Sequence, residues 1–126
     1  MHPPEGEREA RQERAAKNAA VFREVNERLE ELRAPTASFI DFVCECAQVD
    51  CVEQILLTVS EYEALRREPE RFAVSFGHDN PDVDRVVAEG ERYVVVEKIG
   101  TGAATARRLD PRGSGSEKRH ARSTAC

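Results

Sequence analysis

The sequence predicts an α+β fold: a small, mostly antiparallel sheet of about four strands with short helices, a long N-terminal helix and a disordered C-terminal tail. Two observations carry this prediction. Strong helix formers fill residues 5–32, and four short apolar stretches alternate with turn or cap signals between residues 38 and 99. Because few residues separate these stretches, we expect neighbouring strands to pair antiparallel, with helices on one side of the sheet.

The N-terminal helix is predicted from about Glu5 to Leu32, because alanine, glutamate and arginine dominate this stretch and Pro35 ends it. Its larger apolar residues recur at spacings of three and four, which places them on one face: Phe22, Val25, Leu29 and Leu32. We expect the last three turns to dock on the body through this face while the first half projects into solvent. In the alternative, the first half binds a partner or a second copy of the chain.

The middle of the chain supplies the strands, which we expect at residues 39–44, 54–59, 72–76 and 93–99. Ser60 and Glu63 have the spacing of a capping box, which predicts a short helix that ends before Pro69. Asn80-Pro81 is typical of a second short helix, with Gly90 as its left-handed C-terminal cap.

Composition limits the function classes that remain open. The chain has 126 residues and a formal net charge of -5, which suits one compact domain without a separate catalytic domain. The longest wholly apolar run is Ile55–Leu57, far short of a membrane span, and the N-terminus lacks the apolar region of a secretory signal. We therefore expect a cytoplasmic protein with no membrane partner.

Charge divides unevenly along the chain. Residues 1–99 hold 13 basic and 22 acidic residues, whereas residues 100–126 hold 6 basic and 2 acidic ones. The basic tail is rich in Gly, Ala, Ser, Thr and Arg, so it has little apolar surface to offset the entropy lost on ordering. We expect the tail to be disordered, and a nucleic-acid-binding arm is the alternative.

Three of the four cysteines fall within eight residues, at Cys44, Cys46 and Cys51. In a cytoplasmic chain such a cluster favours metal binding or redox chemistry over a disulfide framework. Alternate residues of an extended segment point to the same side, so Cys44 and Cys46 project together. A turn through Asp50 then returns Cys51 to them.

Thiolates and imidazole are the ligands that zinc prefers, and a closed structural zinc site has four of them. His78 is the predicted fourth ligand, because it follows the third predicted strand in a loop near a strand end. A nearby acid is the alternative fourth ligand, and four are candidates: Asp41, Glu45, Asp50 and Glu53. His2, His120 and Cys126 lie in the predicted disordered ends and are poor ligands. A single structural zinc ion would offset the thin core of so small a domain.

Other interpretations of the same residues stay open. The C-x-C pair also suits a redox dithiol or reduced structural cysteines. A catalytic triad could be built from a nucleophile, a base and an orienting acid at Cys51, His78 and Asp79. No family signature surrounds these residues, so we lean against an enzyme. Nucleic acid is disfavoured as a partner, because phosphate would be repelled by the acidic body.

Several segments carry a resemblance to a known family: residues 22–28, 41–51, 57–63, 77–78 and 92–98. The chain resembles a family of small uncharacterised actinobacterial proteins over about residues 15–99, most specifically in the C-x-C-x4-C cluster and the later Gly-His. The resemblance implies a Cys/His site and no activity. We divide the chain into an N-terminal helix docking on the body (1–35), an α+β zinc-binding domain (36–99) and the tail (100–126).

From these observations we expect a small zinc-stabilised protein that binds an as yet unidentified protein or regulates one, through its N-terminal helix and acidic surface. Self-association through that helix is an alternative mode of contact. The alternative functions are a thiol-based redox or metal sensor and a nucleic-acid-associated zinc module that uses the basic tail.

Overall fold

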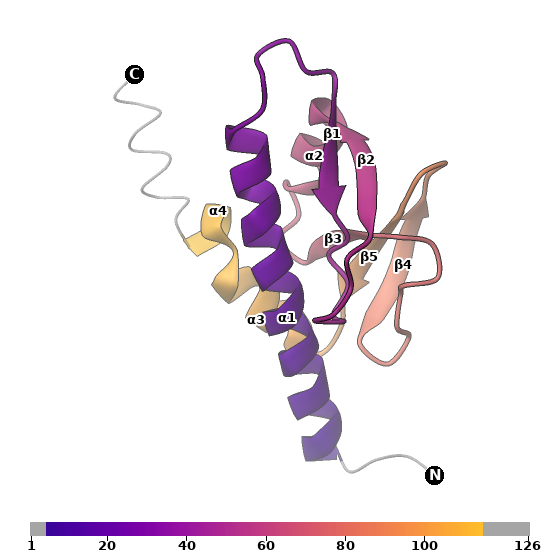
Figure 1. Ribbon diagram of the computed structural model, residues 1–126. Helices are drawn as coiled ribbons and strands as arrows, with labels where there is room; N and C mark the ends of the chain where they lie inside the picture. The colour runs from indigo at the N-terminus through magenta and orange to yellow at the C-terminus, as the bar shows by residue number, and fades with distance from the viewer. Residues whose placement is uncertain (1–4, 115–126) are drawn as a thin grey trace.

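A computed structural model of the chain describes residues 5–114 (Figure 1). The elements follow one another in the order α1 (Glu5–Glu31), β1 (Phe39–Val43), β2 (Gln54–Thr58), α2 (Val59–Leu65), β3 (Arg71–Val74), β4 (Asp84–Glu89), β5 (Val94–Lys98), α3 (Thr101–Leu109) and α4 (Pro111–Ser114). The predicted α+β class, the long N-terminal helix and the antiparallel pairing are confirmed. Within the described range, no helix combines the length and apolar character that crossing a membrane requires.

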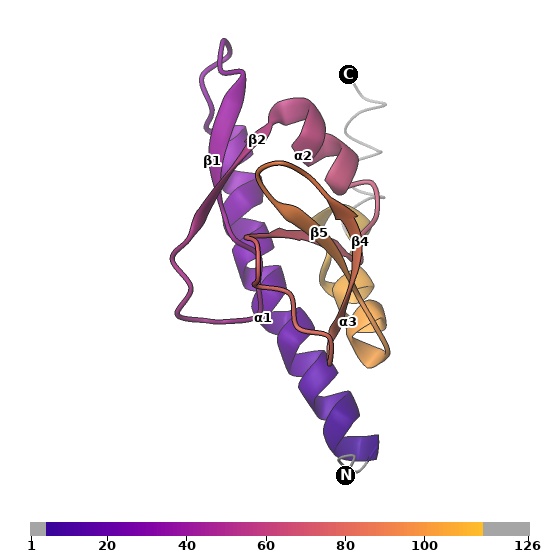
Figure 2. The same ribbon diagram turned by 90° about the vertical axis from the view of Figure 1, so that its right-hand side faces the viewer.

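The strands form two small sheets instead of one. β1 pairs with β2 as a hairpin, and a separate sheet has the order β3-β5-β4 with β5 in the centre. β3 and β4 are both antiparallel to β5, so they run parallel to each other. Residues 75–83 must therefore cross from one end of this sheet to the other, and the crossing loop (residues 75–83) carries His78 (Figure 2).

The helix predicted from Asn80 is wrong, because residues 84–89 form β4 instead. Asn80 starts a single turn, in which its carbonyl oxygen accepts a hydrogen bond from the Val83 amide at 3.0 Å. The β-branched residues that follow then pair with β5. The left-handed cap predicted at Gly90 is also wrong, since Gly77 and Gly100 are the glycines with positive φ among the described residues.

The capping box of α2 lies two residues earlier than predicted. The Glu61 amide donates to the Thr58 hydroxyl at 3.0 Å, and the Thr58 amide donates to the Glu61 carboxylate at 2.8 Å. These reciprocal bonds satisfy two amides at the helix start, so β2 passes into α2 without a loop. Ser60 and Glu63 lie inside the helix.

The N-terminal helix docks along a different face, and over a greater length, than the sequence predicted. Val25 is 43% exposed and Leu32 is 74% exposed, so the predicted apolar face is only partly used. The buried positions are instead four alanines and five polar residues: Ala15, Ala16, Ala19, Ala20, Gln12, Arg23, Asn26, Glu27 and Glu30. Small side chains let α3 approach closely, and a Cβ on Gly102 of α3 would lie 2.9 Å from the Gln12 carbonyl oxygen.

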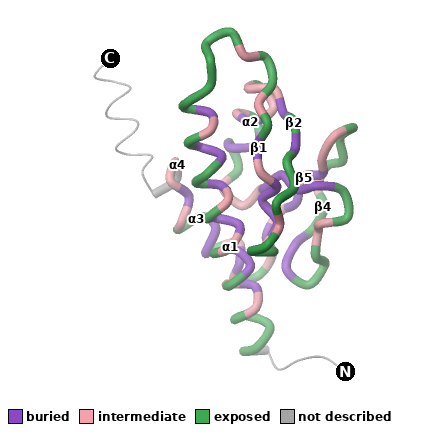
Figure 3. The backbone as a smooth tube through the Cα atoms, in the orientation of Figure 1, coloured by how far each residue is buried: buried purple, intermediate pink, exposed green. Residues whose placement is uncertain are grey.

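The core has two parts, one on each face of the β3-β5-β4 sheet. On one face, α1 and α3 cover Phe72, Val74 and Val96, and Cys44 and Cys46 join this cluster. On the other face, the β1-β2 hairpin and α2 cover Ala73 with larger apolar side chains: Phe42, Ile55, Leu57, Tyr62 and Leu65. β3 and β5 are therefore covered on both faces, whereas β4 is mostly exposed. The cysteine loop (residues 44–53) enters the core beside this sheet (Figure 3).

The expectation of a disordered tail from residue 100 is wrong for residues 101–114, which form α3 and α4. Buried Thr105 and Ala106 pack α3 against the body. Polar contacts hold the chain beyond it, because Asp110 pairs with buried Arg66 and Arg112 donates to Glu27 at 2.6 Å. Small side chains pack α3 and ion pairs attach α4, so neither helix needs large apolar residues, which explains why composition misled the prediction. Residues 115–126 lie outside the described range.

Candidate metal centre

The structure brings together the four residues that the sequence singled out. Cys44, Cys46 and Cys51 come from the cysteine loop between β1 and β2, and His78 comes from the crossing loop between β3 and β4. Their ligand atoms all lie within 4.8 Å of one another. These four residues are therefore positioned to bind one metal ion at the junction of the two sheets.

The cysteine loop folds as the alternation of its residues dictates. Cys44 and Cys46 point toward the cluster, while the Glu45 side chain between them points the opposite way and is completely buried. The Cys51 amide then donates to the Gln48 carbonyl oxygen at 3.0 Å, which closes the turn that brings the third thiol back.

The buried carboxylate of Glu45 fixes this loop to the rest of the fold. It accepts hydrogen bonds from the Asn26 side chain of α1 at 2.8 Å and from the Ala73 amide of β3 at 3.0 Å. Asn26 also bonds both backbone groups of Val43, at 2.8 and 2.9 Å, along the edge of β1. Sequence reasoning missed this positioning role of Asn26 and Glu45, for which the only signal was an acid between two core-facing cysteines.

His78 owes its position to a tight turn at the end of β3. The His78 amide donates to the Ser75 carbonyl oxygen at 3.0 Å, and Gly77 has a φ of 81°. This φ matches the third position of a type II turn, which only glycine adopts readily. Gly77 thus directs the imidazole toward the cysteines.

The contacts of His78 fit a shared ion better than a hydrogen bond. Its Nδ1 lies 3.5 Å from Cys44 Sγ and 3.6 Å from Cys51 Sγ. A zinc ion with bonds of about 2.3 Å to sulfur and about 2.0 Å to nitrogen in a tetrahedron holds these atoms about 3.5 Å apart. One ring nitrogen makes a single directed hydrogen bond, whereas here two sulfurs lie at nearly equal distances from it.

Burial controls the protonation of the thiols. It raises the pKa of the Cys44 thiol, and it raises the pKa of Cys46 to about 12. The Ser75 amide opposes this effect by donating to Cys44 Sγ at 3.2 Å, and the Gln48 amide does the same at Cys46. A bound cation would supply the remaining stabilisation of the thiolates, so that metal binding releases protons.

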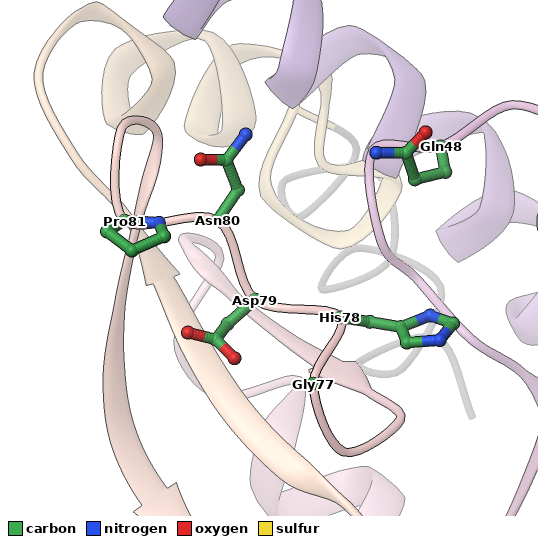
Figure 4. Close-up of a pocket in the computed structure, with 6 residues that line it drawn as sticks. All are labelled: Gln48, Gly77, His78, Asp79, Asn80 and Pro81. Atoms are coloured by element: carbon green, nitrogen blue, oxygen red, sulfur yellow. The ribbon is translucent and has the colours of Figure 1, made fainter.

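One side of the centre faces the core and the other faces solvent. Cys44 and Cys46 are buried, whereas Cys51 and His78 are partly exposed. An open pocket of about 320 Å³ lies beside His78, and both loops line it through Gln48, Gly77, His78, Asp79, Asn80 and Pro81 (Figure 4). The centre is therefore within reach of solutes from the loop side.

The structure also bears on the alternative ligands and on catalysis. The cluster contains none of the four acids considered as a fourth ligand, and Glu45 uses its carboxylate elsewhere. Figure 4 shows the Asp79 carboxylate pointing away from the His78 ring, so these residues do not have the orientation of a catalytic triad. His2, His120 and Cys126 lie outside the described residues.

Comparison of the chain with protein-family models, with curated proteins and with solved structures found no significant match.

Proposed function

We propose that this chain is a small zinc-stabilised module that works by binding another protein or regulating it. The observation that carries the proposal is the set of four converging ligands, Cys44, Cys46, Cys51 and His78. They come from two loops that no strand pairing joins, so one ion would tie the β1-β2 hairpin to the other sheet. The energy of metal binding would then be part of the folding energy.

The donor set favours zinc over the other common cations. Three thiolates and an imidazole are soft or borderline ligands, whereas magnesium and calcium prefer oxygen. Four protein ligands also fill a tetrahedral zinc site completely. A catalytic zinc keeps one position open for water, so this donor set supports a structural role and no hydrolytic reaction.

The surface near the centre supports a protein-binding role. Apolar side chains project from both metal-bearing loops, with Val49 71% exposed, Val52 88% exposed and Phe76 55% exposed. Exposed apolar side chains that gather on one surface, unlike scattered ones, mark binding sites, and these three come from the two loops that meet at the centre. The acidic loops would repel nucleic acid, which disfavours a phosphate-rich partner.

Elemental analysis, and thermal unfolding in the presence of a chelator, test whether the chain binds zinc. We expect one zinc per chain after purification without added metal, and a fall in melting temperature of about 10 °C or more when a strong chelator removes it. Cys51→Ser should show the same fall, while Cys126→Ser serves as the matched control and should melt like the wild type. A metal-free chain, or a melting temperature insensitive to the chelator, contradicts the proposal.

The partial exposure of Cys51 favours a second candidate function, a thiol-based redox or metal sensor. Labelling of native thiols separates the two functions. Slow labelling that speeds up only with chelator supports the structural centre, whereas one thiol that reacts rapidly in the metal-loaded protein supports the sensor.

A further inference from the structure

The cysteine loop and the crossing loop both present apolar side chains and carboxylates. We name this surface the metal-loop face and define it by six residues: Val49, Val52, Phe76, Asp50, Glu53 and Asp79. We propose that the metal-loop face binds a partner peptide segment in which lysine or arginine alternates with apolar residues. This inference rests on the proposed protein-binding function and names the chemistry of its partner.

Charge is the first argument. No lysine or arginine occurs between Arg33 and Arg66, or between Arg71 and Arg85, and these stretches contain both metal-bearing loops. A zinc ion bound by three thiolates and a neutral imidazole adds one further negative charge. The face therefore attracts cations and repels anions over a distance of about 10 Å at moderate salt.

The carboxylates of the face are also free of internal ion pairs. Within residues 5–114, Asp50, Glu53 and Asp79 form no ion pair, whereas Glu61 pairs with Arg92 at 2.7 Å and Glu97 with Arg85 at 2.5 Å. A cationic partner could contact these three carboxylates without first breaking internal bridges. The desolvation that such contacts require is small at an exposed rim.

The pocket beside His78 supplies a place for one long side chain. Its lining offers the Asp79 carboxylate and the amide oxygens of Gln48 and Asn80, all of which can accept hydrogen bonds from a lysine or arginine. Val49 follows Gln48 in the chain and Phe76 precedes Gly77, and both side chains are exposed on the two loops that line the pocket. A segment that combines cationic and apolar residues matches the chemistry of this arrangement.

Two other occupants fit less well. Nucleic acid is anionic and is repelled by every carboxylate of the face. The chain's own residues 115–126 supply Lys118, Arg119 and Arg122, but their apolar side chains are no larger than alanine and cysteine. They could therefore contact the carboxylates and not the exposed Val49, Val52 and Phe76.

Fluorescence titration with short synthetic peptides tests the proposal on the full, zinc-loaded chain. The probe alternates lysine, leucine and serine, and two matched peptides replace either every lysine with glutamate or every leucine with serine. We expect the first peptide to bind and both matched peptides to bind at least about tenfold more weakly. Equal binding of the glutamate peptide, or tighter binding of a DNA duplex, overturns the proposal.

Variants then place the binding on the chain. Asp50→Asn, Glu53→Gln and Asp79→Asn combined should weaken binding of the probe about tenfold. The matched control changes the same amount of charge at exposed positions elsewhere, with Glu24→Gln, Glu31→Gln and Glu68→Gln, and should change binding less than about twofold. An equal loss in both variants shows non-specific attraction and contradicts the metal-loop face.

A second pair of variants tests the apolar half of the face. Val49→Ser with Val52→Ser should weaken binding of the probe about tenfold, whereas Val21→Ser with Val25→Ser on the exposed side of α1 should leave it unchanged. Zinc content is measured for every variant, because none of these residues is a ligand. A zinc-loaded chain that does not distinguish the peptides refutes only this inference, while a zinc-free wild type refutes the proposed function.

Discussion

The buried carboxylate of Glu45 should hold the cysteine loop in place, and its removal should be costly. Glu45→Ala removes one of the two acceptors of the Asn26 side-chain amide and the acceptor of the Ala73 backbone amide, whose bonds to Glu45 measure 2.8 and 3.0 Å. It also removes the carboxylate whose charge favours the protonated form of the buried Arg23 guanidinium. Burial lowers the pKa of Arg23 to about 10, and the charge of Glu45 opposes this shift.

The magnitude follows from these lost contacts. A hydrogen bond to a charged group contributes about 1.5–3 kcal/mol, so two such bonds predict a loss of about 3–6 kcal/mol in the free energy of unfolding. Glu45→Gln keeps the volume and one carbonyl acceptor, and it should lose about 2 kcal/mol. The smaller change keeps the measurement meaningful if the alanine variant does not fold.

Denaturant unfolding in excess zinc measures both variants. Glu53→Ala is the matched control, because this glutamate lies exposed in the same loop and should change stability by less than about 0.5 kcal/mol. The reasoning is refuted if Glu45→Ala lies within about 1 kcal/mol of the wild type. A Glu45→Gln protein that folds should also retain zinc less tightly, because the carboxylate positions the loop that carries the three thiols.

Two further predictions concern a turn and a charge cluster. An added Cβ at Gly77 meets open space, but Gly77→Ala forces alanine to a φ of 81°. The variant should therefore lose about 1 kcal/mol in the free energy of unfolding and retain zinc less tightly in a chelator competition. Gly6→Ala also meets open space and should show neither effect. Burial beside Glu63 raises the pKa of Glu30 to about 7, so the folded state holds this proton more tightly than the unfolded chain does. The free energy of unfolding should therefore fall by about 1 kcal/mol as pH rises from 4.5 to 7. In unfolding titrations at several pH values, Glu30→Gln should remove this pH dependence. An unchanged pH dependence in that variant assigns it to another group.

The same charge cluster explains how the C-terminal helices attach. Arg112 donates to Glu63 at 2.7 Å, and this contact holds the pKa of Glu63 down at about 2. Arg112 also donates to Glu27, which accepts a further bond from the Tyr62 hydroxyl at 2.9 Å. One guanidinium thus joins α4 to α1 and α2, and it allows α4 to pack with almost no apolar surface of its own.

Local patterns in the sequence were enough to predict α1, α2, most of the strands and the four candidate ligands, but not β4, α3 or α4. Helix formers and Pro35 set the limits of α1, and the apolar stretches set four of the five strands. The C-x-C spacing by itself puts two thiols on one side of an extended segment, and the next turn needs only four residues to return the third. These features depend on neighbours in the chain, which is why one sequence was sufficient to find them.

Only the tertiary structure decided which surfaces are buried. The alanine half of α1 is covered because α3 crosses it, and β4 forms because β5 offers a free edge. Both outcomes depend on residues far away in the chain, which local propensity does not include. The sequence by itself determined which side chains can bind a metal ion. The fold determined that His78 reaches Cys44 and Cys51, because the crossing loop passes the place where the cysteines enter the core.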